Sequence, residues 1–511
     1  MSAIYSSDVA YSGEEKIVIA MDIGTTHTGV SFVHCYPGER PKVNLVTRWP
    51  GQATASGAAK IPTFVVYEGS RWITCGQEAD AYLDDDSCEI IRWFKLHLHG
   101  ESLKQSDQPP KYGSHSNFSS RLEIPDLPNG LSVERVYVDF MKYLLNQAQK
   151  FFEDHISNGE AIWRRLRPRM EFVLATPNGW DITQQSFLRR AAIAAEWVTT
   201  SNAGTSIKFV TEGEASVHYV LAYSPSKTWL SVGTVFAVID AGGSTVDSTL
   251  YRCKALEPDL QLEEVCGSEC VQEEVAQTFD NVIAGIAESC QRLIRGRRVE
   301  HILLVGGFGE SPYLKKRLSD IFSKQGAQVV TVEQPSEGAA IWYIKRLVKA
   351  RAARFTLGTI SSSAVHRAEH LERIGSAFVD SDGLLTVRHT FTTLVKKDQV
   401  LDDDYTHTGS FAAVFSLIEM LFIPESVTRK MDIYAWEGEG DAPVWARDKE
   451  GEELTPGLRL LCTLEGKMPR LKESMKLMTG PGGRKYLQSD LRVLIYLGGT
   501  ELTARLQWTE G

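Results

Sequence analysis

Two stretches of the chain share one design, in which an apolar, β-branched run ends in an aspartate and a turn of glycine and hydroxyl residues. Glycines let backbone N–H groups approach phosphate oxygens, and a carboxylate can hold a hydrated magnesium ion. Two copies in one chain predict a duplicated fold that grips one phosphate chain from two sides. The copies hold Asp22, Gly24, Thr25 and Thr26, and Asp240, Gly242, Gly243, Ser244, Thr245 and Asp247.

Three further places carry residues that such a phosphate site needs. Lys95 lies in an aromatic run and is either brought to the phosphate or solvated on a helix. Glu212 ends an apolar run before a helix of small residues. The glycine turn at residues 306–309 leads into a helix that Ser311 and Pro312 are suited to start. Its open backbone suits a flat ligand such as a nucleoside.

The composition limits the partners that we expect. With 511 residues, 43% hydrophobic and 23% charged, the chain has the make-up of a globular protein of several folding units. A formal net charge of -10 provides no basic field for nucleic acid or an acidic membrane surface. No apolar run approaches the ~20 residues that span a bilayer. Eight scattered cysteines without a secretory signal favour reduced thiols and a cytoplasmic location.

Hydrophobic periodicity predicts how the chain is organised. A disordered tail is expected over residues 1–16, followed by strands that alternate with helices. From about residue 355, alternating apolar runs separated by glycine turns predict an antiparallel, β-rich domain. The predicted helices include 131–156 with Ser132 as N-cap, 181–198 with Asp181 as N-cap, 271–292, and one from Pro335 to about Arg354.

Taken in order, these motifs resemble the nucleotide-binding domain of the seventy-kilodalton heat-shock chaperones, within the actin and sugar-kinase fold. Residues 304–309 and 337–340 complete the ordered set, and residues 306–314 look more like a divergent heat-shock-70-like branch than the main chaperones. The resemblance covers roughly residues 17–350. It implies an α/β fold with duplicated actin-like, ribonuclease-H-like ATPase lobes at 17–221 and 222–354, followed by a β-rich C-terminal domain at 355–511.

The resemblance also implies roles for these residues in binding ATP or ADP with Mg²⁺. The reaction would be slow hydrolysis, by in-line attack of water on the γ-phosphate. Lys95, Glu212 and Asp247 would act near the attacking water and the metal. Asp22 and Asp240 would hold the metal, the remaining glycine and hydroxyl residues of the two turns would wrap the phosphates, and Gly306, Gly307 and Gly338 would border the adenosine.

The chain departs from the family in two respects. The interval before the strand at 302–305 is short, because it consists only of residues 271–301. In the family, this interval holds a whole helical subdomain over the adenine. The long helical peptide lid is not expected either, because the sequence ends soon after its last apolar run.

Three functions follow from these motifs and departures. The first is an ATP-binding, slowly hydrolysing chaperone-type protein with unfolded or regulatory protein clients, and the retained phosphate turns favour it. The second is a pseudo-ATPase scaffold or interaction module with weak or lost nucleotide binding, which the shortened lobe favours. The third is a sugar kinase of the same superfold, with an acid as base. The sequence indicates no oligomeric state.

Overall fold

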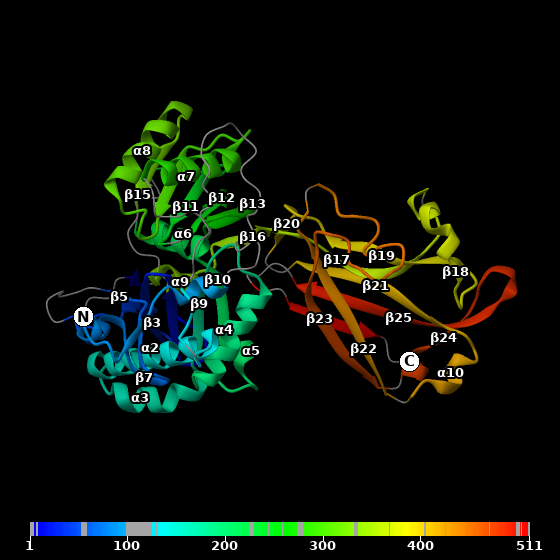
Figure 1. The fold of residues 1–511 in the computed structure, drawn as a ribbon, viewed down its shortest axis with the longest axis horizontal. Helices are drawn as coiled ribbons and strands as arrows, with labels where there is room; N and C mark the ends of the chain where they lie inside the picture. The colour runs from blue at the N-terminus through cyan, green and yellow to red at the C-terminus, as the bar shows by residue number, and fades with distance from the viewer. Residues whose placement is uncertain are drawn as a thin grey trace. The chain divides into compact units, whose positions relative to one another are not determined.

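A computed structural model of the chain shows a mixed α/β protein (Figure 1). Contacts divide it into unit 1, Met1–Glu264 with Ser268–Val348, and unit 2, Val265–Gly267 with Lys349–Gly511. Among the described residues, no helix has the length and apolar character that crossing a membrane requires. The structure describes residues 5–6, 9–52, 59–98, 125–128, 130–223, 229–243, 245–257, 259–272, 279–331, 336–366, 368–402, 405–424, 426–438, 440–469, 471–496, 501 and 503–508.

The first sheet of unit 1 is built around β2 (Lys16–Ile23). β2 pairs antiparallel with β3 (His27–Cys35) and parallel with β9 (Glu171–Thr176). β9 in turn pairs parallel with β10 (Ile207–Thr211). The strands β1 (Tyr5–Ser6), β4 (Lys42–Leu45) and β5 (Lys60–Pro62) complete this sheet.

This sheet is covered by helices on both faces, which explains why β2 is a continuous apolar run rather than an alternating one. Ile17, Ile19 and Met21 face α2 (Val133–His155), α3 (Gly159–Leu166) and α4 (Ile182–Ala194). Val18 and Ala20 face the opposite way, toward α9 (Ser336–Ile344). The predicted caps of α2 and α4 are confirmed. Ser132 accepts a hydrogen bond from the Arg135 amide, and Asp181 forms a capping box with Gln184.

The second sheet repeats this strand order. β11 (Val235–Ala241) pairs antiparallel with β12 (Thr245–Ala255) and parallel with β14 (His301–Val305), which pairs parallel with β15 (Gln328–Thr331). β13 (Gln261–Gln272) follows β12 in the sheet. α7 (Phe279–Ile294) contacts β12, and α8 (Pro312–Phe322) contacts β15. Ser311 caps α8 as predicted, accepting a hydrogen bond from the Leu314 amide.

Two crossing helices join the two sheets. α6 (Glu212–Tyr223) begins directly after β10 of the first sheet, and its Val217 and Val220 pack on β11 of the second. α9 follows β15 of the second sheet in the chain and packs on the first sheet. At the crossing, a Cβ atom on Gly338 would lie 1.8 Å from the carbonyl oxygen of Ala215. Only glycine therefore allows the two helix backbones to approach this closely.

Smaller elements surround these sheets in unit 1. A separate sheet has the order β7, β6, β8 and lies beside α2. Its strands are β6 (Val65–Glu68), β7 (Arg71–Cys75) and β8 (Glu89–Ile91), and the short helices are η1 (Gly76–Tyr82), η2 (Phe94–Leu98), η3 (Arg167–Arg169), α5 (Ala203–Ser206) and η5 (Ser323–Gln325).

Unit 2 contains two antiparallel sheets whose side chains share a core that includes Leu394, Ile433 and Val493. One sheet is formed by β17 (Thr356–Ala364), β18 (Phe378–Val379), β19 (Leu385–Val395), β22 (Ser426–Trp436) and β23 (Leu458–Pro469). The other is formed by β21 (Thr406–Phe415), β24 (Lys476–Thr479), β25 (Lys485–Tyr496) and β26 (Thr503–Trp508). The short helices are η6 (Ala368–Ser376), α10 (Glu419–Phe422), η7 (Leu471–Ser474) and η8 (Pro481–Gly483).

Three predicted helices differ from the structure. The helix expected over 181–198 ends at Ala194. The helix expected from Pro335 to about Arg354 ends at Ile344, and Val348–Ala352 forms strand β16 instead. β16 pairs antiparallel with β20 (Val400–Asp402), so a partner distant in sequence overrides the local helical preference. Of the helix expected over 271–292, residues 271–272 belong to β13 instead and Phe279–Ile294 forms α7, while 273–278 lie outside the described residues.

The predicted tail over residues 1–16 also carries structure. Tyr5–Ser6 forms β1 and pairs antiparallel with β4. Glu15 receives hydrogen bonds from Arg165 at 2.6 and 2.8 Å and lies 2.9 Å from His34 Nε2. An open sheet edge and a charged partner distant in sequence thus fix part of a segment whose polar composition predicted disorder.

Candidate functional site

The antiparallel pairs β2–β3 and β11–β12 each form a hairpin. The turns of these two hairpins meet in unit 1 at a cavity of about 300 Å³. A Cβ atom on Gly243 of the second turn would lie 2.5 Å from Cγ2 of Thr26 in the first, so the two turns are in contact. The cavity is at the lower end of the size range of small-molecule sites. Its lining residues are Asp22, Gly24, Thr25, Thr26, His27, Lys60, Lys95, Glu212, Asp240, Gly242, Gly243, Gly306, Gly307 and Glu310.

The first turn presents Asp22 from the end of β2. Asp22 is only 6% exposed, yet its side chain lines the cavity. The Gly24 amide donates a 3.1 Å hydrogen bond to the His27 carbonyl, which closes the turn. A Cβ atom on Gly24 would lie 2.4 Å from that carbonyl oxygen, so the tight turn requires glycine.

The second turn presents Asp240 from the end of β11 and is fixed by the glycine turn after β14. The Phe308 and Gly309 amides donate to the Ala241 carbonyl at 2.9 and 3.2 Å. Gly306 has a φ of +85°, and a Cβ atom there would lie 2.4 Å from Oδ1 of Asp240. The predicted turn at 306–309 therefore fixes the end of β11 and also lines the cavity.

A buried ion pair crosses the cavity wall. Lys95 Nζ, on η2, donates to Glu212 Oε1 at 2.7 Å and lies 5.4 Å from the centre of the Trp180 ring. Lys95 is 4% exposed, so the alternative of a solvated surface lysine is wrong. Burial disfavours its charge, but the carboxylates of Glu212, Asp22 and Asp240 outweigh that cost and hold its pKa above the ordinary value.

The acids around the cavity repel one another. Burial, together with the charges of Glu212, Asp247 and Asp22, raises the pKa of Asp240 well above its usual range. Burial also raises the pKa of Glu212, although Lys95 opposes this effect. A positive charge brought into the cavity would favour the ionised forms of these acids. Cation binding here is therefore expected to release protons.

Several predicted site residues lie elsewhere. Asp247 is buried on β12, directly opposite Asp240 in the strand ladder, and Thr245 begins the same strand. Gly338 lies at the crossing with α6. Neither Asp247 nor Gly338 is among the residues that line the cavity, and Ser244 and the Thr245 side chain lie outside the described parts of the structure. The other predicted site residues are brought together there.

The sequence reasoning missed Lys60, His27 and Glu310, which also line the cavity. Lys60 Nζ lies 3.9 Å from Asp22 Oδ2. Lys60 follows a stretch rich in glycine and alanine, and its place at the cavity comes from the pairing of β5 with β3. No local pattern signals that pairing. His27 directly follows the predicted turn, so a wider reading of that motif would have included it.

Glu337 stands in the motif at 337–340, but sequence reasoning assigned it no role at the site. Its side chain lies in the first turn of α9, the residue is 4% exposed, and Oε2 has no hydrogen-bond partner among the described residues. Burial raises its pKa to about 7, with a smaller opposing effect from Lys60.

The residues around the cavity fit a magnesium-bound phosphate ligand. Among the described residues, no three His, Cys, Asp or Glu side chains are grouped closely enough to hold a metal by themselves. Mg²⁺ is usually held by one or two carboxylates together with water and substrate phosphates. Asp22 and Asp240 can supply the carboxylates, and the glycine turns offer backbone amides for phosphate oxygens.

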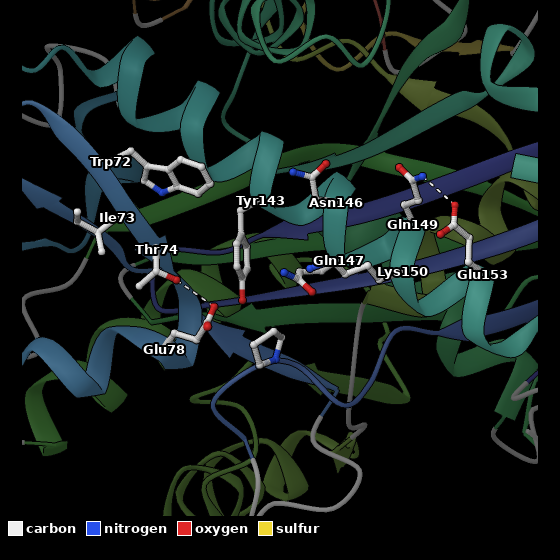
Figure 2. Close-up of a pocket in the computed structure, with 11 residues that line it drawn as sticks. Trp72, Ile73, Thr74, Glu78, Tyr143, Asn146, Gln147, Gln149, Lys150 and Glu153 are labelled. Atoms are coloured by element: carbon white, nitrogen blue, oxygen red, sulfur yellow. Dashed lines mark hydrogen bonds between the residues drawn. The ribbon is translucent and has the colours of Figure 1, made fainter. Parts of the chain in front are cut away.

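A larger cavity of about 540 Å³ lies between β7 and α2 (Figure 2). Thr74 donates a hydrogen bond to Glu78 at 2.9 Å, and Gln149 donates one to Glu153 at 2.8 Å. Both pairs are visible in Figure 2. Carboxamides and aromatic rings make up much of the remaining lining. None of the site residues predicted from the sequence lines this cavity, and it has no glycine turn.

No family model matches the chain. The chain is 23% identical over 302 residues to heat shock 70 kDa protein 12A of Mus musculus. It is also 23% identical over 312 residues to the human protein of that name. This similarity supports a distant relationship to heat-shock-70-like proteins. The matches cover 48% and 50% of this chain, and less than half of the relatives' own length, 42% and 43%.

Proposed function

We propose that this chain binds Mg²⁺ with ATP or ADP at the cavity between the two hairpin turns and hydrolyses ATP slowly. The observation that carries the proposal is the meeting of the two acid–glycine turns, with Asp22 and Asp240 at one cavity. The repeated strand order of the two sheets supports duplicated actin-like lobes. The distant similarity to heat shock 70 kDa protein 12A supports the same class.

Each group at the cavity has a task in this proposal. The Asp22 and Asp240 carboxylates hold the hydrated metal, and the amides of both turns bind phosphate oxygens. The bound metal supplies electrostatic stabilisation of charge on the phosphates. Glu212, which binds Lys95 at 2.7 Å, would orient a water for in-line attack once Lys95 turns to the phosphate. Protein clients, a chaperone role and a cytoplasmic location belong to the same proposal.

A pseudo-ATPase is the second candidate, and one observation favours it. Lys95, the lysine assigned to the attacking water, is already bound to Glu212 in a buried pair. If that pair persists with nucleotide bound, the chain binds ATP without hydrolysing it.

Calorimetric titration with Mg-ATP and Mg-ADP tests the proposal. We expect micromolar binding by the full chain and a loss of at least about a hundredfold in an Asp22→Asn, Asp240→Asn double variant, because the metal loses both carboxylates. The variant should stay folded, since it removes two like charges from a crowded cavity, and a melting curve checks this. Absence of binding by the folded wild-type chain overturns the proposal. Release of phosphate by the bound protein separates the ATPase from the pseudo-ATPase.

A further inference from the structure

Lys60 reaches the cavity across three neighbouring strands. Asp22 on β2 pairs with Gly29 on β3, and Gly29 pairs with Lys60 on β5. Residues opposite one another in a ladder share a face of the sheet. Because Gly29 has no side chain, the lysine can extend over β3, and its Nζ comes to 3.9 Å from Asp22 Oδ2.

The two cavity lysines are held differently. Lys95 is 5% exposed at its side chain and hydrogen-bonds Glu212 at 2.7 Å. The Lys60 side chain is 24% exposed, and its 3.9 Å contact with Asp22 is an ion pair longer than a hydrogen bond. The ammonium of Lys60 therefore has N–H groups that can donate a hydrogen bond to a phosphate oxygen.

The backbone at Lys60 is fixed, although its side chain has several rotatable bonds. Gln52 Nε2 donates to the Lys60 carbonyl at 2.8 Å, and the ladder with β3 holds Gly29 and Thr28 beside β5. The ammonium can thus move between Asp22 and the interior of the cavity without any movement of the strand.

We propose that Lys60 balances the charge of Asp22 when no divalent cation is present, and binds a phosphate oxygen when Mg²⁺ and nucleotide enter. This rests on the proposed function and adds a residue to it. The ammonium and the metal compete for one carboxylate, whereas the ammonium and the phosphate attract each other. The two ligands should consequently respond to Lys60 in opposite directions.

Calorimetric titration of the full chain with Mn²⁺ alone and with Mg-ATP tests this. In Lys60→Met, we expect Mn²⁺ alone to bind about threefold to tenfold more tightly, because its competitor at Asp22 is gone. Mg-ATP should bind about tenfold to a hundredfold more weakly, because a charge-assisted hydrogen bond is lost. Lys60→Arg keeps the charge and should restore part of the ATP affinity.

Lys208→Met is a matched control, since Lys208 is 26% exposed, forms an ion pair with Glu171 on the same sheet and does not line the cavity. It should change neither affinity. If Lys60→Met weakens both ligands together, Lys60 is structural and the proposal is wrong. Unchanged binding of both ligands also overturns it. If wild type and every variant bind no ATP, the proposed function fails as well. This outcome differs from a failure of the Lys60 proposal alone, in which wild type still binds ATP.

Discussion

The two hairpins of unit 1 use one scaffold but have different electrical surroundings. In both, an antiparallel pair is followed by two parallel strands, and an aspartate stands near the end of the first strand. The ladder partner of Asp22 is Gly29, which lets Lys60 approach. The ladder partner of Asp240 is Asp247, a second buried acid. Like charges opposite each other in a ladder are unfavourable.

This difference teaches that the repeated strands place the two acids, whereas the charge around each depends on side chains that the two repeats do not share. The cations come from β5 and η2, which both precede α2 in the chain. The second hairpin receives an acid from its own return strand. A metal held between the two aspartates would therefore compete with a lysine on the side of Asp22 and would relieve the repulsion between two acids on the side of Asp240.

The largest expected effect comes from a substitution that disturbs the packing of α6 against α9, the two helices that join the sheets of unit 1. Gly338→Ala places a Cβ atom where the Ala215 carbonyl stands, 1.8 Å away, and backbone cannot yield as a flexible side chain can. We expect a loss of about 3 kcal/mol or more in the free energy of unfolding, measured by urea denaturation.

Gly204→Ala provides the control, because a Cβ atom at Gly204 would meet nothing within 4 Å. It should be neutral or slightly stabilising, since alanine restricts the unfolded chain. Equal effects of the two substitutions would show that the helices separate easily, and that the two sheets are not held by this crossing.

The sequence predicted the features whose signals are local. Ser132, Asp181 and Ser311 cap their helices because a side-chain oxygen meets an amide two or three residues on. The acid–glycine turns were found because strand, acid and glycine are consecutive. Lys60 and β16 were missed because strands distant in sequence position them, and pairing of that kind leaves no local pattern. The role of Gly338 depends on a helix more than a hundred residues earlier.

The next effect concerns Glu337, near Lys60, and depends on pH. Its pKa is about 7 in the folded chain, above the ordinary value of 4.5. The folded state thus holds a proton that the unfolded state loses, so stability falls as pH rises from about 4.5 to 7. Glu337→Gln should remove this fall and be more stable than wild type by about 3 kcal/mol at pH 8, with little difference at pH 4.

Denaturation of both proteins across this pH range is the measurement. Glu300→Gln, which changes a glutamate with a 45% exposed side chain, should follow the wild-type curve. A wild-type stability that is flat between pH 5 and 8 would contradict the proton-binding role of Glu337.

The smallest expected effect addresses the acid pair of the second hairpin directly. Asp247→Asn removes a charge opposite Asp240, and should lower the pKa of Asp240 and stabilise the fold by about 1 kcal/mol at pH 8. An acid whose pKa is raised by folding loses stability as pH rises, so the gain should shrink at lower pH, where Asp240 holds a proton in both proteins. A carboxyl-detected NMR titration of Asp240, with Asp320→Asn on exposed α8 surface as control, checks both statements. If the titration of Asp240 does not move, Asp247 contributes no charge to the second turn, and the two hairpins differ only in the lysines of the first.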